Sequence, residues 1–233
     1  MCDAQDRAAG AIPCQDCATH APDLSPGMAA PAPAHGAADD VARIGPNSII
    51  RMAEALTAAV GQADTADLFA EAGLSHHLAV PPDSMVPAAD VTALHRVLRA
   101  RLDRATMVAV SRRAGEATGD YLLAHRIPKP AQVVLKLLPP VPAARILIKA
   151  MGKHAWTFAG AGRFEGHAGR PTRLVIAGGP IQAAVPGAGI AVCDYYAATF
   201  ERLFRELVAR KATVREVACE AAGGTACTFE VVW

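Results

Sequence analysis

Two kinds of hydrophobic pattern divide this chain of 233 residues. Up to about residue 45 the chain mixes Ala, Pro, Gly and Asp without any apolar period, so this segment buries too little surface to offset the entropy of ordering. From Pro46-Asn47-Ser48, which is a helix-start signal, apolar residues begin to recur at regular spacing. We therefore expect residues 1–45 to form a disordered tail and residues 46–233 to form one folded domain.

Helical spacing dominates the first part of this domain. After the start signal, Ile49, Met52, Leu56 and Val60 lie on one helical face. Prolines separate the helices that follow, because a proline cannot continue a helix beyond its first turn. The pattern predicts further helices over residues 64–71, 87–102 and 105–126, and on both sides of Pro139-Pro140-Val141-Pro142.

Gly115 and Gly119 lie four positions apart in the helix predicted over residues 105–126. Residues at this spacing share one helical face, so the pair gives that face two spots without side chains. We expect the backbone of another element to approach the helix closely there.

From Ala155 onward the pattern changes to that of short strands. Trp156, Phe158 and Phe164 stand among glycines, and Leu174-Val175-Ile176 follows. Apolar and aromatic residues between turn-forming residues are typical of strands. We therefore expect strands to begin near Ala155.

A long helix and a hairpin close the chain. A stripe of aromatic and leucine side chains predicts a helix from Cys193 to about Arg210. Residues 213–219 and 225–232 predict a hairpin around Gly223-Gly224. Helices first and strands afterwards favour an α+β fold in which helices pack on an antiparallel sheet.

Three cysteines and one glutamate, Cys193, Glu216, Cys219 and Cys227, gather in the predicted helix and hairpin. Zinc accepts thiolate sulfur and carboxylate oxygen in a tetrahedral shell, so these residues supply four suitable ligands. Four protein ligands leave no open position, which predicts a structural zinc site. The alternative is that the cysteines are small buried hydrophobic residues and Glu216 is a solvated strand residue.

The predicted hairpin makes this site geometrically specific. A turn centred near Gly223 sets Cys219 opposite Cys227, which brings both sulfurs to one end of the two strands. Glu216 precedes Cys219 by an odd number of residues, so a regular strand would turn them to opposite faces, and we expect a bulge or the strand end to correct this. Cys193 begins the long helix, where the helix dipole favours a thiolate.

Composition narrows the setting of this domain. The formal net charge of +1 gives no support for nucleic-acid binding. No apolar run is long enough for a membrane span, and no export signal is visible, so we expect a cytoplasmic protein with reduced thiols. The Cys14-Gln15-Asp16-Cys17 motif is followed by Ala18 rather than the His of a covalent haem site, and we interpret it and Cys2 as incidental.

The cysteine and glutamate residues resemble the ligand set of the 4-vinyl reductase domain, in which Cys, Glu, Cys and Cys follow at these intervals of 23, 3 and 8 residues. The Arg113–Gly119 segment is similar to that family's helix with paired glycines, and Cys219–Val232 is similar to its last hairpin. The resemblance covers residues of about 46–233 and lacks the DNA-binding and ATPase parts of the large phenol sensors. It points to the stand-alone bacteriochlorophyll 4-vinyl reductase family.

This resemblance implies a fold similar to vesicle-tethering (TRAPP-type) subunits and phenol-sensor domains, a homodimer and a hydrophobic ligand pocket. It also implies a role in bacteriochlorophyll biosynthesis, peripheral to the photosynthetic membrane, with magnesium chelatase or the following methyltransferase as partner.

Vinyl reduction requires a hydride source, but no NAD(P) or flavin motif is visible in the sequence. Gly160-Ala161-Gly162 lacks a third glycine, and Gly178-Gly179-Pro180 cannot open a dinucleotide-binding turn. A protein that binds a magnesium porphyrin and delivers it between enzymes fits better. The alternatives are a 4-vinyl (8-vinyl) reductase that uses an external electron donor and a sensor of small aromatic compounds.

Candidate tetrapyrrole contacts come from residue chemistry. Arg112, Arg113 and Arg126 suit the carboxylates of a tetrapyrrole at the pocket rim, although solvated helix faces carry the same residues. An imidazole is an acceptable axial ligand for magnesium, and Trp156 suits a pocket wall. The histidines considered for the axial position are His125 and His154.

Overall fold

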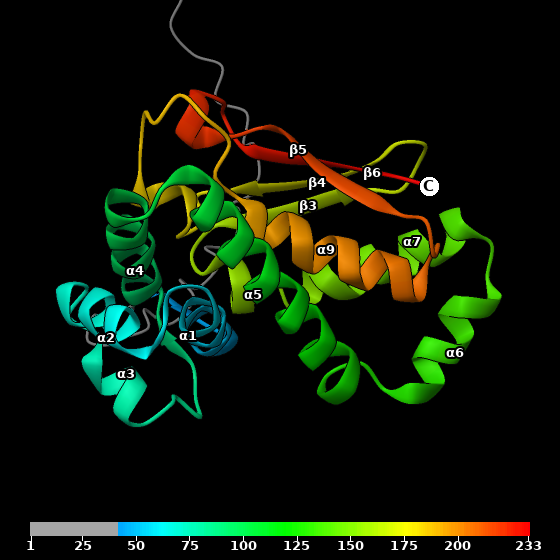
Figure 1. Cartoon of the computed structure of the whole chain (residues 1–233). Helices are drawn as coiled ribbons and strands as arrows, with labels where there is room; N and C mark the ends of the chain where they lie inside the picture. The colour runs from blue at the N-terminus through cyan, green and yellow to red at the C-terminus, as the bar shows by residue number, and fades with distance from the viewer. Residues whose placement is uncertain (1–41) are drawn as a thin grey trace, which may run out of the picture. The chain divides into compact units, whose positions relative to one another are not determined.

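The computed structural model describes residues 42–233 (Figure 1). The predicted disordered tail lies outside the described residues except for its last four positions, and so do Cys2, Cys14 and Cys17. Two residues assigned to the tail form a strand, because β1 (Arg43–Ile44) pairs with β2 (Val86–Pro87) and Ile44 is buried. A pair of this length has no periodicity that a sequence pattern can reveal.

A four-stranded antiparallel sheet has the order β3-β4-β6-β5. The last strand of the chain therefore lies inside the sheet, where it pairs with both β4 and β5. Alternate residues of β4 and β6 are buried, which gives the sheet one core face. The strands are β3 (Arg163–His167), β4 (Thr172–Ala177), β5 (Thr213–Ala218) and β6 (Cys227–Val232).

Two long helices, α5 (Arg104–His125) and α9 (Asp194–Leu207), pack together below the sheet in Figure 1. A Cβ atom at Gly115 would lie 2.3 Å from the Tyr195 carbonyl oxygen, and one at Gly119 would lie 2.7 Å from the Arg202 side chain. The close approach expected at the glycine pair is confirmed.

Shorter helices surround this pair, and the predicted α+β class is confirmed. No helix of the described part is both long enough and apolar enough to span a membrane. The remaining elements are α1 (Asn47–Val60), α2 (Gln62–Glu71), α3 (Ser75–Ala79), α4 (Ala88–Arg101), α6 (Lys129–Leu137), α7 (Pro140–Lys153), α8 (Trp156–Ala159) and the 3-10 helices η1 (Gln182–Ala184) and η2 (Glu220–Ala222).

The strand expected near Ala155 is wrong, because the chain makes the short helix α8 before the first strand of the sheet begins. The Ala155 carbonyl accepts a hydrogen bond from the Ala159 amide at 2.8 Å, which closes a helical turn. Phe158 still reaches the core, where its ring lies 5.3 Å from that of Phe164. Aromatic burial therefore did not require an extended backbone here.

Candidate metal centre

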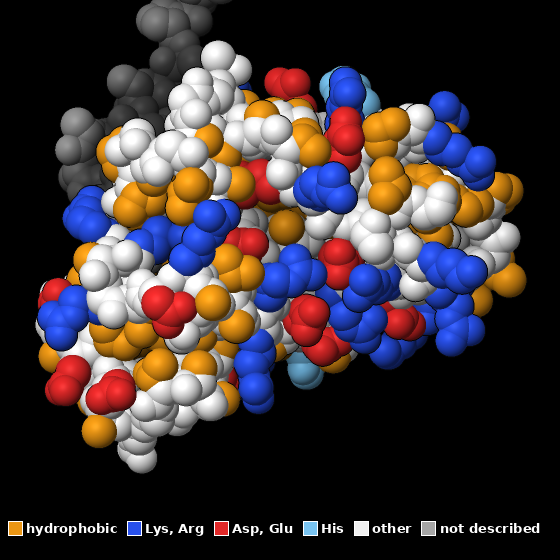
Figure 2. All heavy atoms as spheres, turned by 45° about the horizontal axis from the view of Figure 1, so that its top comes forward, with side chains coloured by type: hydrophobic (Ala, Val, Ile, Leu, Met, Phe, Trp, Pro, Cys, Tyr) orange, Lys and Arg blue, Asp and Glu red, His pale blue; other side chains and the backbone are white. Residues whose placement is uncertain are grey.

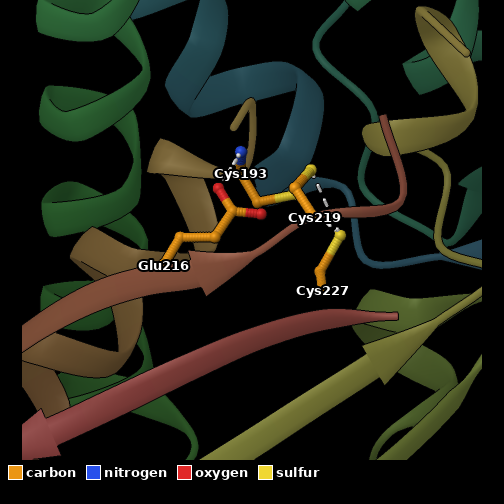
Figure 3. Close-up of side chains that lie close together, drawn as sticks. All are labelled: Cys193, Glu216, Cys219 and Cys227. Atoms are coloured by element: carbon orange, nitrogen blue, oxygen red, sulfur yellow. Dashed lines mark hydrogen bonds between the residues drawn. The ribbon is translucent and has the colours of Figure 1, made fainter. Parts of the chain in front are cut away.

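Three separate elements bring Cys193, Glu216, Cys219 and Cys227 together (Figure 3). Cys193 caps the start of α9, Glu216 lies on β5, and the other two cysteines stand where the β5–β6 hairpin leaves and re-enters the sheet. One ligand atom from each side chain lies within 4.8 Å of all the others.

The sulfur atoms are spaced like the corners of a coordination shell. The Cys193 and Cys227 Sγ atoms are 3.4 Å apart, and the Cys227 and Cys219 Sγ atoms are 3.5 Å apart. A tetrahedral site with zinc–sulfur bonds of about 2.3 Å requires sulfurs about 3.8 Å apart. A small adjustment of side-chain torsions therefore fits a zinc ion among them.

A bulge in β5 produces this convergence. Glu216 pairs with Phe229, but the next pair joins Ala218 to Thr228, so one residue of β5 is left over. The bulge changes which face the following residues point to, and it supplies the irregularity that the odd spacing required. Beyond it, the Gly224 amide donates to the Cys219 carbonyl at 2.9 Å and holds the hairpin end.

Glu216 is poised as the fourth ligand. Its Oε2 atom accepts a hydrogen bond from the Cys193 amide at 2.8 Å, while its Oε1 atom is buried with no hydrogen-bond partner among the described residues. Buried carboxylate oxygens are rarely left without a partner. In Figure 3 the free oxygen lies on the side of the sulfurs, where a metal ion would satisfy it.

The protonation of the cluster also favours a cation. Burial raises the pKa of Glu216 to about 8. Hydrogen bonds with Cys219 and Cys227, together with burial, raise the pKa of the Cys193 thiol, whereas the same neighbours lower the pKa of Cys219 by donating to it. Without an ion the cluster therefore holds most of its protons, and a bound metal would displace them.

A cationic neighbour accompanies the cluster. Zinc with three thiolates and one carboxylate carries a net negative charge, which is unfavourable in a buried position. Arg99 of α4 donates to the Val192 carbonyl next to Cys193, and its pKa is lowered by burial but raised by Asp194 and the ligand residues. The sequence did not single out Arg99, because only the tertiary contact between α4 and this corner identifies it.

A second cluster, also missed by sequence reasoning, joins α3 to α4. His76, His77 and Asp90 each place one donor atom within 4.8 Å of the others. The His77 Nε2 and Asp90 Oδ2 atoms are 3.1 Å apart, while His76 is exposed. The adjacent histidines were the available signal, but their aspartate partner lies on another helix.

The candidate tetrapyrrole residues fall into separate groups. Arg112 is paired with Glu201 at 3.2 Å, and Arg113 is exposed nearby on α5. His125 and Arg126 end the same helix, about 20 Å further along its axis. His154 caps the end of α7, and Trp156 is exposed on α8.

An aromatic ring connects two of these candidates. The Tyr121 ring lies 4.7 Å from the His125 ring, and the guanidinium groups of Arg126 and Arg51 stand 6.0 Å and 5.5 Å from its centre. Tyr121 and Arg51 were not candidates, because they meet only when α1 packs on α5.

Comparison with known proteins identifies the class. The family model of the 4-vinyl reductase domain matches residues 172–232, a segment that contains all four residues of the candidate metal centre. The fold and the Cys/Glu cluster therefore belong to a protein with a 4-vinyl reductase domain, as the sequence resemblance indicated.

Two similar proteins then narrow the family. Both are named bacteriochlorophyll synthase 23 kDa chain. The one from Cereibacter sphaeroides is 42% identical over 191 residues, which cover 82% of this chain and 90% of the relative. The one from Rhodobacter capsulatus is 40% identical over 202 residues, which cover 86% of this chain and 90% of the relative. This chain belongs to the family of these proteins.

Proposed function

We propose that this protein acts in bacteriochlorophyll biosynthesis, where it binds a magnesium porphyrin intermediate and delivers it between pathway enzymes. The observation that carries the proposal is the 42% identity to a relative named as a chain of bacteriochlorophyll synthase, over 90% of that relative's length. A protein named as one chain of a synthase works with others, and magnesium chelatase or the following methyltransferase suits an intermediate that already carries magnesium.

In this proposal the Cys/Glu centre binds a structural zinc ion. Cys193, Cys219 and Cys227 are at most 2% exposed, so substrate has no path to the sulfurs. Four protein ligands complete the zinc shell, whereas catalytic zinc sites keep one position open. The ion would fasten the start of α9 to the β5–β6 hairpin and would contribute directly to folding.

The glycine-rich segments support binding rather than hydride transfer. The Gly160–Gly162 segment connects α8 to β3, and Gly178-Gly179 leads from β4 through Pro180 to η1. A dinucleotide-binding turn instead leads from a strand directly into a helix whose amides receive the pyrophosphate. A reductase built on this chain would therefore need an electron donor from a partner.

The group around Tyr121 is the best-supported ligand contact. An imidazole, an aromatic face and two guanidinium groups are adjacent there, from His125, Tyr121, Arg126 and Arg51. An imidazole can bind magnesium axially, and guanidinium groups pair well with carboxylates. Both suit a magnesium porphyrin with carboxylate substituents.

The experiment is a titration of the metal-loaded protein with magnesium protoporphyrin and with divinyl protochlorophyllide, followed by absorbance with and without NADPH. A shifted Soret band without turnover is the expected result. NADPH-dependent loss of the vinyl group would instead establish a reductase. Phenol binding in the absence of any tetrapyrrole binding would favour a sensor of small aromatic compounds.

A variant pair tests the axial ligand. His125→Gln should weaken magnesium protoporphyrin binding by at least about tenfold, because the imidazole nitrogen is lost. His167→Gln is the matched control, since His167 is also exposed but lies at the end of β3. Unchanged affinity in His125→Gln would remove that residue from the site, and His154→Gln then tests the other candidate.

A further inference from the structure

Helix α6 has the reverse of the usual arrangement of polar and apolar residues. Its buried residues are Gln132 and Leu135, while Val133, Val134 and Leu137 are 57%, 54% and 79% exposed. Surface helices normally turn their apolar face to the core and their polar face to water. The outward apolar stripe of α6 is therefore not explained by the packing of this domain.

Polar contacts hold α6 in this orientation. The Gln132 amide nitrogen donates to the Leu123 carbonyl at 2.6 Å and to the Ile127 carbonyl at 2.8 Å, and both carbonyls belong to the end of α5 and the turn after it. These bonds satisfy backbone groups that the end of α5 leaves free. They also fix the rotation of α6, so its valines stay exposed.

Helix α7 extends the same face. Its exposed positions form a helical stripe that contains Ile146, which is 48% exposed. The other exposed side chains of the stripe include Arg145, Lys149 and Lys153. We refer to the exposed residues of α6 and α7 as the α6–α7 face.

The charge on this region has one sign. Residues 126–154 contain six Lys or Arg and no Asp or Glu. Lys136 pairs with Glu206 of α9, but Lys129, Arg145, Lys149 and Lys153 form no ion pair with any described residue. In Figure 2, blue and orange side chains lie together at the right-hand end, where Figure 1 shows α6 and α7.

We propose that the α6–α7 face docks on the surface of an anionic lipid bilayer. Helices that lie in a bilayer surface combine an apolar face with flanking Lys and Arg, and these cations are attracted to anionic headgroups. The valines and Leu137 enter the boundary between headgroups and acyl chains, while Lys129, Lys149 and Lys153 contact lipid phosphates.

Charge selects this occupant over a second copy of the chain. In a two-fold dimer the same face meets itself, so a face on which α7 carries only cations would face like charges. An anionic bilayer supplies the opposite charge over the whole face. The inference rests on α6 and α7 alone and does not depend on tetrapyrrole binding.

The test is flotation of the full chain with vesicles of phosphatidylcholine and with vesicles that also contain phosphatidylglycerol. We expect binding to the anionic vesicles that weakens as salt is raised, and little binding to the neutral ones. Lys149→Gln should lower the partition onto anionic vesicles about fivefold. The double variant Val134→Ser, Leu137→Ser should lower it by at least about tenfold.

Val80→Ser is the matched control, because Val80 is 74% exposed but follows α3, away from α6 and α7. This variant should bind like the unmodified protein, and all variants should keep its melting temperature. Three results would overturn the proposal: no vesicle binding, equal binding to neutral and anionic vesicles, or conversion of a dimer to a monomer by Leu137→Ser.

Discussion

The metal corner and the α6–α7 face depart from normal burial in opposite directions. At the corner, the carboxylate of Glu216 is buried with one oxygen unpaired, whereas on α6 the large apolar Leu137 is 79% exposed. Natural sequences usually satisfy local rules of burial, and their exceptions concentrate where function requires them. The comparison therefore separates an interior site for an ion from an exterior site for a surface.

The two regions also differ in how they are held. The corner joins the start of α9 to both strands of the last hairpin, so its loss affects the centre of the domain. Helix α6 is held mainly by Gln132 and Leu135 at the edge. We therefore expect changes at the corner to affect stability and changes on the exposed face of α6 to affect only binding.

The largest expected effect is that of Cys219→Ser. A hydroxyl is a poor replacement for a thiolate ligand, so the variant should lose its metal ion and several kcal/mol of the free energy of unfolding. Metal analysis and urea unfolding measure both quantities. Val217→Ser is a control on the same strand, since Val217 is 48% exposed and should be replaced without metal loss. Retained metal and an unchanged melting temperature in Cys219→Ser would refute the site.

Gly115→Ala should have the next largest effect, because α5 and α9 connect the corner to the rest of the core. The added Cβ would lie 2.3 Å from the Tyr195 carbonyl oxygen, so the helices must separate at a cost of about 1–3 kcal/mol in the free energy of unfolding. Thermal unfolding of the metal-loaded protein measures this loss.

Gly152→Ala controls for helix propensity in that experiment. Gly152 lies in α7, and nothing stands within 4 Å of a Cβ added there. Alanine is favoured over glycine in a helix, so this variant should be as stable as the unmodified protein or slightly more stable. Equal effects of the two substitutions would mean that the α5–α9 contact is not tight.

The sequence anticipated these features to different degrees. The intervals between Cys193, Glu216, Cys219 and Cys227 were enough to expect a cluster and an irregular strand, because hairpin register is set by local spacing. The glycine pair was readable for the same reason. Local periodicity does not encode which strands pair across the sheet, so the inner position of β6 was not foreseeable.

Side-chain partners distant in the sequence were also beyond prediction. Arg112 was a candidate for ligand contact, yet it pairs with Glu201 of α9. Tyr121 and Arg99 acquire their roles only through packing between helices. The outward turn of α6 was hidden as well, since an apolar helical stripe gives no information about which way it faces.

His95 gives the corner side of the molecule a dependence on pH. Burial, with a smaller effect from the Arg99 charge, lowers the pKa of His95 from 6.5 to about 3. Between these values the unfolded chain binds a proton that the folded protein does not, so the free energy of unfolding falls as the pH is lowered. Between pH 6.5 and 5 this loss should be about 1.5 kcal/mol.

His95→Gln should remove that part of the pH dependence. Urea unfolding at pH 6.5 and pH 5 compares the two proteins, and the difference between the two pH values should be smaller in the variant. His167→Gln is the control, because His167 is exposed on β3. An identical pH dependence in His95→Gln would show that His95 takes up a proton in the folded state.

The smallest expected effect on stability is that of Leu137→Ala, which tests the α6 side of the comparison. Leu135 and Leu137 lie two positions apart on the same helix, but they are 5% and 79% exposed. Leu135→Ala should cost about 2–3 kcal/mol in the free energy of unfolding, whereas Leu137→Ala should change it by less than about 0.5 kcal/mol. Urea unfolding measures both. Since the two substitutions remove the same atoms, a comparable loss in Leu137→Ala would show that this side chain is covered in the free protein and is not available to a bilayer.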